Sequence, residues 1–174
     1  IAPGFIWDPN PNFTIISFPG VPAELKVMWR QYAAPWLINN HLTNEVITSK
    51  MLRFTGINES EIAERFPHLL ASKNPTVAPY AGLGEVKLRL TAKGETINQA
   101  KELLAPIERE LKYRTGTLFY GSDSETLASI VVKILRQRGE TLAVAESCTG
   151  GGIGAKITEV AGASAVFLGG VITY

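Results

Sequence analysis

The sequence predicts a multidomain protein that combines α/β and α+β architecture. Three observations support this fold class. The chain opens with a strand and a helix, continues in the order strand, helix, strand, strand, helix, strand, and closes in the order helix, strand, helix, strand. The middle order is typical of an α+β layer, whereas the closing alternation is typical of a parallel α/β sheet. We therefore expect three regions, residues 1–37, 38–121 and 122–174.

The first region, residues 1–37, is expected to be the end of a larger α/β domain. Its opening segment IAPGFIWDPNPN is loop-like, and β-branched and aromatic residues predict a strand over Phe13–Phe18. A helix is expected over residues 23–37, with Pro22 in its first turn. Helical spacing predicts a buried face made of Leu25, Met28, Trp29 and Tyr32. A strand and a helix alone are too small to enclose a core.

The middle region, residues 38–121, is expected to form one sheet with helices on one face. Strands are predicted at 45–54, 76–80, 85–92 and 117–121, and helices at 59–70 and 96–113. Asn58 and Glu61 have the spacing of a capping box, and Pro67 is expected to bend or end the first helix.

Side-chain periodicity identifies the core faces of this layer. In the strand over 85–92, Val86, Leu88 and Leu90 share one face, and the polar side chains of Lys87, Arg89 and Thr91 share the other. The core face of the second helix is expected to contain Ile97, Ala100, Leu103, Leu104, Ile107 and Leu111. Pro106 predicts a kink in this helix.

The last region, residues 122–174, is expected to open a three-layered α/β domain with a parallel sheet. Ser122–Glu125 is the expected N-cap cluster of a helix that ends at Gly139. The apolar face of that helix contains Leu127, Ile130, Val131, Ile134 and Leu135. LAVAES then predicts a buried strand, GGIGAKITEVAG a helix and AVFLGGVITY a second strand.

Composition excludes several classes of protein. The chain has 174 residues and a formal net charge of +1, with acidic and basic residues interleaved, so no nucleic-acid partner is expected. No apolar run approaches the roughly 20 residues needed to span a bilayer, so no membrane partner is expected. A single cysteine, Cys148, excludes an internal disulfide and indicates a reducing, cytoplasmic setting. The chain starts without methionine and stops inside a predicted strand, so we expect it to be an excerpt of a longer protein.

The segment AVAESCTGGG, residues 143–152, is the strongest functional signal, and we call it the elbow. A strand that ends at Glu146 and turns through glycines into a helix exposes side chains at the carboxyl edge of a sheet, where open α/β folds bind ligands. Ser147 is the predicted nucleophile. Unpaired N–H groups at the helix start suit a phosphate or an oxyanion. The predicted substrate-binding residues are Glu146, Thr149, Gly150 and Gly151.

Other interpretations of these residues are open. Small residues after a strand also serve tight strand–helix packing, and Cys148 is either a second candidate nucleophile or a small packing residue. A serine–histidine–carboxylate triad is not expected, because His41 and His68 both lie in the middle region. Lysine or tyrosine remains as the activating group. Tyr174 ends the next strand beside the elbow, or packs there as an ordinary strand aromatic, and Lys156 is expected to point to solvent.

Three segments resemble the CinA family (competence/damage-inducible protein CinA). Residues 142–174 look like the opening of its C-terminal, nicotinamide-nucleotide amidase domain, and the string AESCTGG is specific to that domain. FPGVPAELKVMW resembles the closing strand and helix of the CinA N-terminal domain, which is related to molybdopterin-binding proteins. NPTVAPYAGLGEVKLRLTAKG resembles the KH-like middle domain, although Gly82-Leu83-Gly84 replaces the GXXG loop of a nucleic-acid-binding KH domain.

The resemblance implies an enzyme that hydrolyses the carboxamide of nicotinamide mononucleotide to nicotinic acid mononucleotide and ammonia, in pyridine nucleotide recycling. The family's nucleophilic serine maps onto Ser147 and its functional tyrosine onto Tyr174, whereas a family lysine just beyond that tyrosine has no position here. The amidase needs no cofactor, and no metal ligand is assigned in this chain. In relatives, the N-terminal domain has metal-dependent ADP-ribose pyrophosphatase activity, whose divalent-metal ligands would lie outside this chain. A nucleotide substrate and a homodimer are implied, and the alternative is a nucleotide-binding protein with that pyrophosphatase activity and a lapsed amidase site.

Overall fold

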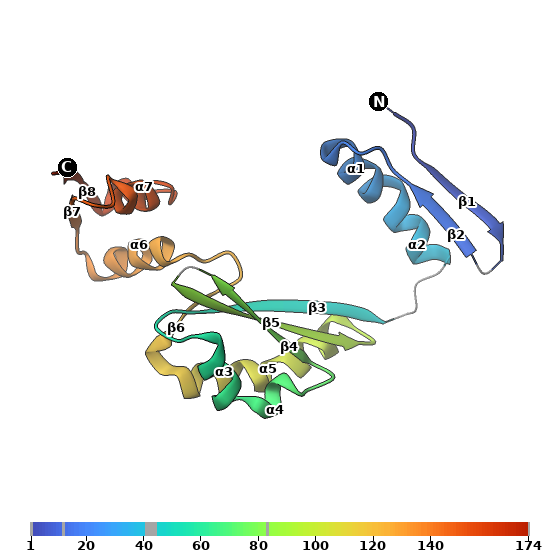
Figure 1. Ribbon diagram of the computed structural model, residues 1–174, viewed down its shortest axis with the longest axis horizontal. Helices are drawn as coiled ribbons and strands as arrows, with labels where there is room; N and C mark the ends of the chain where they lie inside the picture. The colour runs from blue at the N-terminus through green and yellow to red at the C-terminus, as the bar shows by residue number, and fades with distance from the viewer. Residues whose placement is uncertain (1, 12, 41–44, 83, 174) are drawn as a thin grey trace. The chain divides into compact units, whose positions relative to one another are not determined.

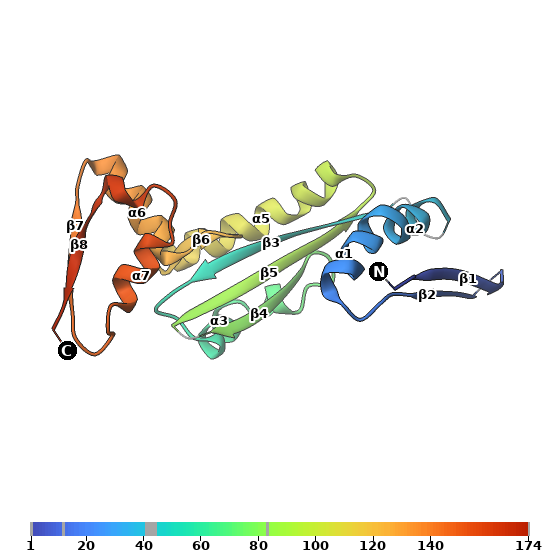
Figure 2. The same cartoon turned by 90° about the horizontal axis from the view of Figure 1, so that it is seen from above.

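Strands of the protein form three separate sheets in the computed structural model, which describes residues 2–11, 13–40, 45–82 and 84–173 (Figures 1 and 2). Two of these sheets have two strands, and the third has four. The chain divides into two units, Ile1–Glu45 and Val46–Tyr174. The mixed α/β character agrees with the fold class expected from the sequence.

The first unit opens with a β-hairpin. Strand β1 (Phe5–Asn10) pairs antiparallel with β2 (Phe13–Ser17), and Ile6 lies opposite Ile16. The prediction of a loop before residue 13 was therefore wrong. The prolines that suggested a loop do not prevent pairing, because the register breaks after Trp7, and Pro9 and Pro11 follow that break.

A long helix with a widened central turn follows the hairpin. It consists of α1 (Pro22–Met28), a π-helical turn (Trp29–Ala33) and α2 (Ala34–Asn40). In the widened turn, the N–H of Ala34 donates to the carbonyl of Trp29, five residues back. The turn directly precedes Pro35, which has no N–H and whose ring would clash with the carbonyl four residues back in a regular α-helix.

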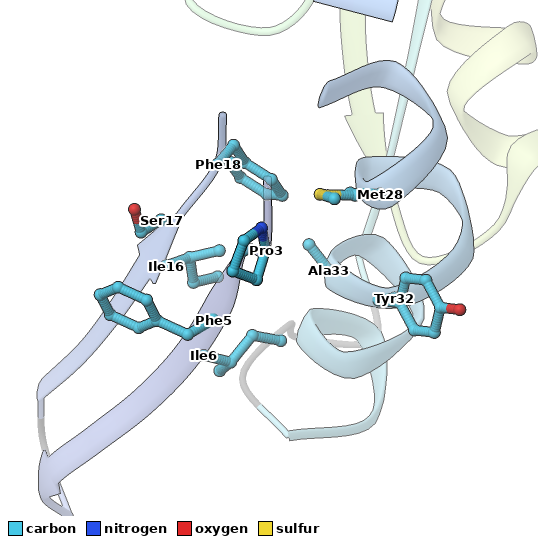
Figure 3. A pocket seen from close by; sticks show the side chains of 10 residues that line it. Pro3, Phe5, Ile6, Ile16, Ser17, Phe18, Met28, Tyr32 and Ala33 are labelled. Carbon is cyan, nitrogen blue, oxygen red and sulfur yellow. The ribbon is translucent and has the colours of Figure 1, made fainter. Parts of the chain in front are cut away.

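The predicted buried face of this helix is largely exposed. Leu25 is 37% exposed, Trp29 44% and Tyr32 66%, while Ala33 is buried. The prediction was wrong for these three side chains because a two-stranded hairpin covers only a narrow stripe of the helix. An apolar hollow of about 410 Å³ remains between hairpin and helix (Figure 3). Phe5, Ile16, Phe18, Met28 and Tyr32 are among the residues that line it.

The middle layer is an antiparallel sheet in the order β4-β5-β3-β6. The strands are β3 (Val46–Phe54), β4 (Thr76–Gly82), β5 (Glu85–Gly94) and β6 (Phe119–Ser122). The helices are α3 (Glu59–Arg65), α4 (Pro67–Leu70) and α5 (Ile97–Thr115), with a 3₁₀ turn over Gly116–Leu118. The predicted order of elements is confirmed. Asn58 and Glu61 form the predicted capping box, and Pro67 begins the separate helix α4.

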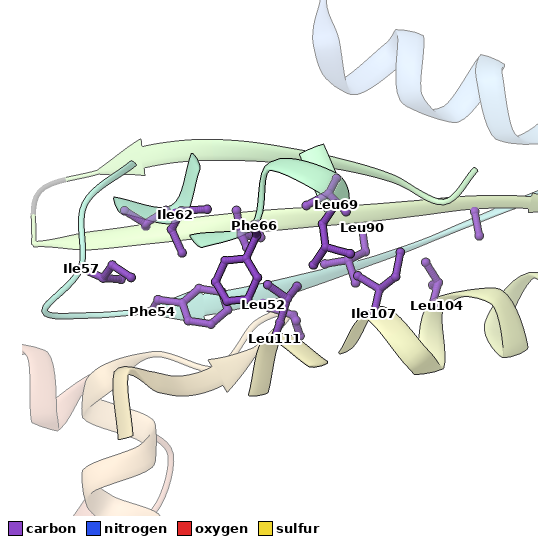
Figure 4. Close-up of a cluster of buried hydrophobic side chains, with 14 of the residues drawn as sticks. Leu52, Phe54, Ile57, Ile62, Phe66, Leu69, Leu90, Leu104, Ile107 and Leu111 are labelled. Atoms are coloured by element: carbon purple, nitrogen blue, oxygen red, sulfur yellow. The ribbon is translucent and has the colours of Figure 1, made fainter. Parts of the chain in front are cut away.

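One hydrophobic core fills the space between this sheet and its helices (Figure 4). Val86, Leu88 and Leu90 are 3%, 0% and 0% exposed, which confirms the predicted core face of β5. The rings of Phe54 and Phe119 meet edge to face across β3 and β6, with centroids 5.8 Å apart. Helix α5 packs on β3 and β5. Its buried side chains are Ala100, Leu104, Ile107, Leu111 and Thr115.

Two expectations for α5 differ from the structure. Ile97 was expected in the core but is 55% exposed. Side chains tilt toward the N-terminus of their helix. The side chain of this first helical residue therefore points beyond the part of α5 that the sheet covers. Pro106 does not interrupt the helix, which runs unbroken from Ile97 to Thr115. The proline is exposed while Leu104 and Ile107 on either side are buried, so packing holds the helix in place there.

The last part of the chain alternates helices and parallel strands, as expected. The elements are α6 (Leu127–Arg138), β7 (Leu142–Glu146), α7 (Gly152–Thr158), a 3₁₀ turn (Ala163–Ala165) and β8 (Phe167–Ile172). β7 and β8 are parallel, and Gly139 ends α6 in the left-handed conformation.

The start of α6 differs from the predicted N-cap cluster at Ser122–Glu125. The N-cap is Thr126, which forms a capping box with Ser129. Residues 122–125 instead form a turn that is linked to β3. The carboxylate of Asp123 accepts the N–H of Met51 at 3.0 Å, and Asp123 has a φ of 51°. The prediction was wrong because a reciprocal capping box satisfies two backbone donors at once, and Thr126 offers that pairing.

Burial in this last part is lower than expected. Val132 is the buried side chain of α6, whereas Leu127 is 47% exposed and Val131 and Ile134 are each 39% exposed. Strand β7 was expected to be buried, but its side chains before Glu146 are half-buried or exposed. A two-stranded sheet gives these side chains too little surface to pack on. A small core forms around Val132, Ile157, Ala163 and Val166.

The layer with the four-stranded sheet provides a test of its core. Leu52 is fully buried, whereas Ile47 on the same strand is 69% exposed. We expect Leu52→Ala to lower the free energy of unfolding by about 2–5 kcal/mol, since it removes buried methyl groups and leaves a cavity. Ile47→Ala, the matched control, should change it by less than about 0.5 kcal/mol. Urea unfolding followed by circular dichroism measures both, and equal losses would contradict the assignment of the core face.

Candidate active site

The elbow joins the carboxyl end of β7 to the start of α7. Residues 147–151 form a turn in which the N–H of Gly150 donates to the carbonyl of Ser147 at 3.0 Å. The N–H of Gly152 donates to the carbonyl of Thr149 at 3.0 Å. Gly150 and Gly151 have φ of 58° and 94°, a region that strains other residues. A Cβ on Gly151 would also lie 2.9 Å from Cδ1 of Ile172, the end of an exposed side chain that can move, so it is the backbone conformation that requires this glycine.

Glu146 lies beneath this turn and is 4% exposed. Its Oε2 accepts the hydroxyl of Thr149 at 2.7 Å and the N–H of Ile153 at 2.9 Å. Its Oε1 accepts the N–H of Gly154 at 2.8 Å. The Thr149 hydroxyl, followed by the N–H groups of Gly154 and Ile153, holds the pKa of Glu146 below its usual range. The carboxylate therefore stays ionised at neutral pH and is directed into its own chain.

Ser147 and Cys148 are exposed at the tip of the turn. Among residues 2–11, 13–40, 45–82 and 84–173, no side chain hydrogen-bonds the Ser147 hydroxyl. An accessible hydroxyl at the carboxyl edge of parallel strands can reach a ligand bound there. Ser147 therefore has the placement that its predicted role as nucleophile requires.

The other predicted binding residues take part in the turn. The Thr149 hydroxyl already donates to Glu146, and the N–H of Gly150 already donates to Ser147. Gly150 was expected to offer its N–H to an oxyanion, and in this conformation that donor is used by the turn. Within the described part of the chain, the N–H groups of Cys148 and Thr149 donate to no other main-chain group.

The end of β8 lies directly beside the elbow. Glu146 is the register partner of Ile172, and the main-chain carbonyl of Glu146 accepts the N–H of Thr173 at 2.7 Å. The Thr173 hydroxyl donates to the same carbonyl at 3.2 Å. The parallel pairing thus brings the two carboxyl ends together, as the sequence predicted. Tyr174, the second predicted catalytic residue, lies outside the described residues.

His68 and Lys156, two of the remaining candidates, have their side-chain partners outside the elbow. Nε2 of His68, on α4, lies 3.0 Å from Oε1 of Glu110 on α5, and His41 falls outside the described residues. The Lys156 side chain is 71% exposed and pairs with Glu159 at 3.0 Å, which confirms that it points to solvent. In the described part of the chain, no three His, Cys, Asp or Glu side chains gather as a metal site, and no helix is both long and apolar enough to cross a bilayer.

An apolar hollow adjoins the turn between α6, β7 and α7. Leu127, Val131, Val144 and Ile153 are among its lining residues, and Thr149 lies at its margin. Sequence reasoning treated Leu127, Val131 and Val144 only as core residues and gave Ile153 no role. Neither their exposure nor the inward direction of Glu146 could be read from spacing, because both depend on how α6 and α7 pack on β7.

Comparison with known proteins gives the family of the chain. Residues 49–121 match the family model of the damage-inducible protein CinA KH domain, and residues 124–174 match the CinA C-terminal domain. A CinA-like protein of Prochlorococcus marinus (strain MIT 9313) is 60% identical over 173 residues, which are 99% of this chain and 40% of that protein. The chain belongs to the CinA family.

Further CinA relatives show the same coverage. CinA-like proteins of Prochlorococcus marinus (strain NATL1A) and Synechococcus sp. (strain CC9902) are 58% and 56% identical over 99% of this chain. The chain spans about 40% of the length of these curated relatives. The elbow falls within the match to the CinA C-terminal domain, and the match to the CinA KH domain covers most of the four-stranded layer.

Two adjacent glycines of the CinA elbow offer a matched test of the turn. Gly151 has φ of 94°, a region that strains residues with a Cβ, whereas Gly152 begins α7 and a Cβ there would meet its nearest neighbour at 3.9 Å. We expect Gly151→Ala to destabilise the protein by about 1–3 kcal/mol through backbone strain. Gly152→Ala should cost nothing, since alanine is the better helix former. Thermal unfolding compares the two, and equal melting temperatures would refute this view of the turn.

Proposed function

We propose that the chain contributes the nucleophile of a nicotinamide-nucleotide amidase, which hydrolyses the carboxamide of nicotinamide mononucleotide to nicotinic acid mononucleotide and ammonia. The observation that supports this most is the exposed Ser147 hydroxyl at the carboxyl edge of two parallel strands, inside the match to the CinA C-terminal domain. The resemblance of AESCTGG to the amidase domain supplies the reaction.

In the proposed reaction, Oγ of Ser147 attacks the carboxamide carbon and its proton passes to Tyr174 and a lysine outside this chain. The tetrahedral intermediate carries its negative charge on the former carbonyl oxygen, and nearby N–H groups stabilise it. The N–H groups of Cys148 and Thr149 donate to no other main-chain group among the described residues, and we assign this role to them. Collapse of the intermediate breaks the C–N bond, the leaving nitrogen takes up the proton, and ammonia departs. Water then hydrolyses the acyl-serine ester and regenerates the hydroxyl.

The domain assignment is part of the same proposal. Residues 1–37 would end a molybdopterin-binding-like domain, residues 38–121 would form the KH-like domain, and residues 122–174 would begin a three-layer α/β amidase domain. We further propose that the complete protein is a cytoplasmic homodimer and that the amidase uses no cofactor. Any divalent metal would belong to the N-terminal domain, with ligands outside this chain.

Replacement of the nucleophile tests the proposal in the full-length protein. Ser147→Ala should lower the rate of ammonia release from nicotinamide mononucleotide by at least about 1,000-fold, because the variant lacks the hydroxyl that forms the proposed acyl intermediate. Ser164→Ala, an exposed serine outside the elbow, is the matched control and should leave the rate unchanged. A coupled enzymatic assay for ammonia measures both rates.

Two further outcomes distinguish the alternatives. Cys148→Ala should retain turnover, since the main-chain N–H persists; loss of turnover there, with activity kept in Ser147→Ala, would identify the thiol as nucleophile. A wild-type protein that hydrolyses ADP-ribose but releases no ammonia would support the pyrophosphatase with a lapsed amidase site.

A further inference from the structure

We propose that Glu146 is a positioning residue, which holds the Ser147 turn and the end of β8 in register, and that it does not bind substrate. The sequence predicted Glu146 as a substrate-binding residue, so this inference changes its role. It rests on the proposed amidase function of the same elbow. Three groups donate hydrogen bonds to its carboxylate.

The donors belong to two different segments, the turn of the elbow and helix α7. The Thr149 hydroxyl, 2.7 Å from Oε2, lies in the turn, and the N–H groups of Ile153 and Gly154, at 2.9 and 2.8 Å, lie in the first turn of α7. One carboxylate therefore joins the end of β7 to both. Because the segment between Glu146 and Ile153 contains Ser147, fixing its two ends restricts where the Ser147 hydroxyl can lie.

The main chain of Glu146 extends this arrangement to the neighbouring strand. Its carbonyl accepts both the N–H of Thr173, at 2.7 Å, and the Thr173 hydroxyl, at 3.2 Å. Ser147 directly follows Glu146 in the sequence, and Tyr174 directly follows Thr173. Glu146 thus holds the chain immediately before each of the two positions that the proposed reaction uses.

A substrate-binding role does not fit the same contacts. Both carboxylate oxygens are already accepting hydrogen bonds, and the residue is only 4% exposed. A Cβ on Gly154 would lie 3.4 Å from Oε1, so the chain approaches the carboxylate closely. The carboxylate also uses two N–H groups at the start of α7 and adds a negative charge there. The phosphate of a nucleotide would therefore have to bind other donors.

Glu146→Gln in the full-length protein tests this role. Glutamine keeps the side-chain volume. Its amide NH₂ must however face at least one of the donors whose hydrogen bonds the carboxylate accepted, and it cannot accept that bond. We expect kcat for ammonia release from nicotinamide mononucleotide to fall about 10- to 100-fold, as for a misplaced catalytic group, while KM stays within about threefold. A raised KM with unchanged kcat would assign Glu146 to substrate binding and overturn the proposal, as would unchanged kinetics.

Three variants control for other effects. Glu159→Gln removes an exposed carboxylate of the same region, which pairs only with Lys156 among the described residues, and should leave kcat and KM unchanged. Thr149→Val removes one donor to Glu146 and should lower kcat, whereas Thr149→Ser restores the hydroxyl and should restore kcat. Equal kcat in the valine and serine variants would contradict the role of this hydrogen bond.

A second readout keeps this inference separate from the proposed function. Cys148 is exposed in the same turn, so the rate at which iodoacetamide alkylates it reports on the turn's geometry. Mass spectrometry of the Cys148 peptide should show a changed rate in Glu146→Gln and an unchanged rate in Glu159→Gln. If the wild type releases no ammonia, the proposed function fails, and the alkylation rates still decide the role of Glu146: equal rates in the wild type and Glu146→Gln would refute it.

Discussion

A carboxylate that leaves water at the end of a strand needs hydrogen-bond donors, and the first turn of a helix has N–H groups that lack partners within the helix. Glu146 and the start of α7 satisfy each other in this way, with the Thr149 hydroxyl as the third donor. The conformation of residues 147–151 follows from this pairing, because both ends of the segment are fixed. The exposure of Ser147 is a consequence of the same geometry.

The glycines of the elbow allow its backbone conformation and also leave its surface accessible. Gly151 adopts φ of 94° and lies against Ile172, and a Cβ on Gly170 would lie 2.6 Å from Cγ2 of Val144. Small residues are therefore required where β7, β8 and the turn come together. The two interpretations of the glycine run, close packing and access to the backbone for a ligand, describe the same positions.

Burial differs sharply between the layers of the chain. The four-stranded sheet and its helices exclude water from a continuous core, in which Leu52, Phe54, Leu88 and Leu90 are fully buried. The two sheets with two strands leave apolar side chains such as Trp7 and Leu168 more than half exposed. A helix that packs on two strands can bury only a narrow stripe, whatever its sequence pattern.

For this reason, predictions of burial succeeded in one layer and failed in the others. Periodicity in the strand over 85–92 identified its core face correctly, because a sheet and helices are present to cover it. The same reasoning failed for Leu25 and Trp29, whose helix meets a two-stranded hairpin, and for Leu127, whose helix packs mainly on α7 and β6. The sequence also did not identify the N-cap residue of α6, because more than one candidate N-cap precedes that helix.

By itself, the sequence determined the order of helices and strands from Phe13 onward, the capping box at Asn58, the core face of β5 and the elbow with Ser147 at its tip. These features depend on the spacing of residues along the chain, which can be read directly from the sequence. Only the tertiary structure decided that Glu146 turns inward, that the Gly150 N–H serves the turn and that β1 pairs with β2. Each depends on contacts that form only when the helices and strands pack together. The spacing of residues along the chain does not predict those contacts.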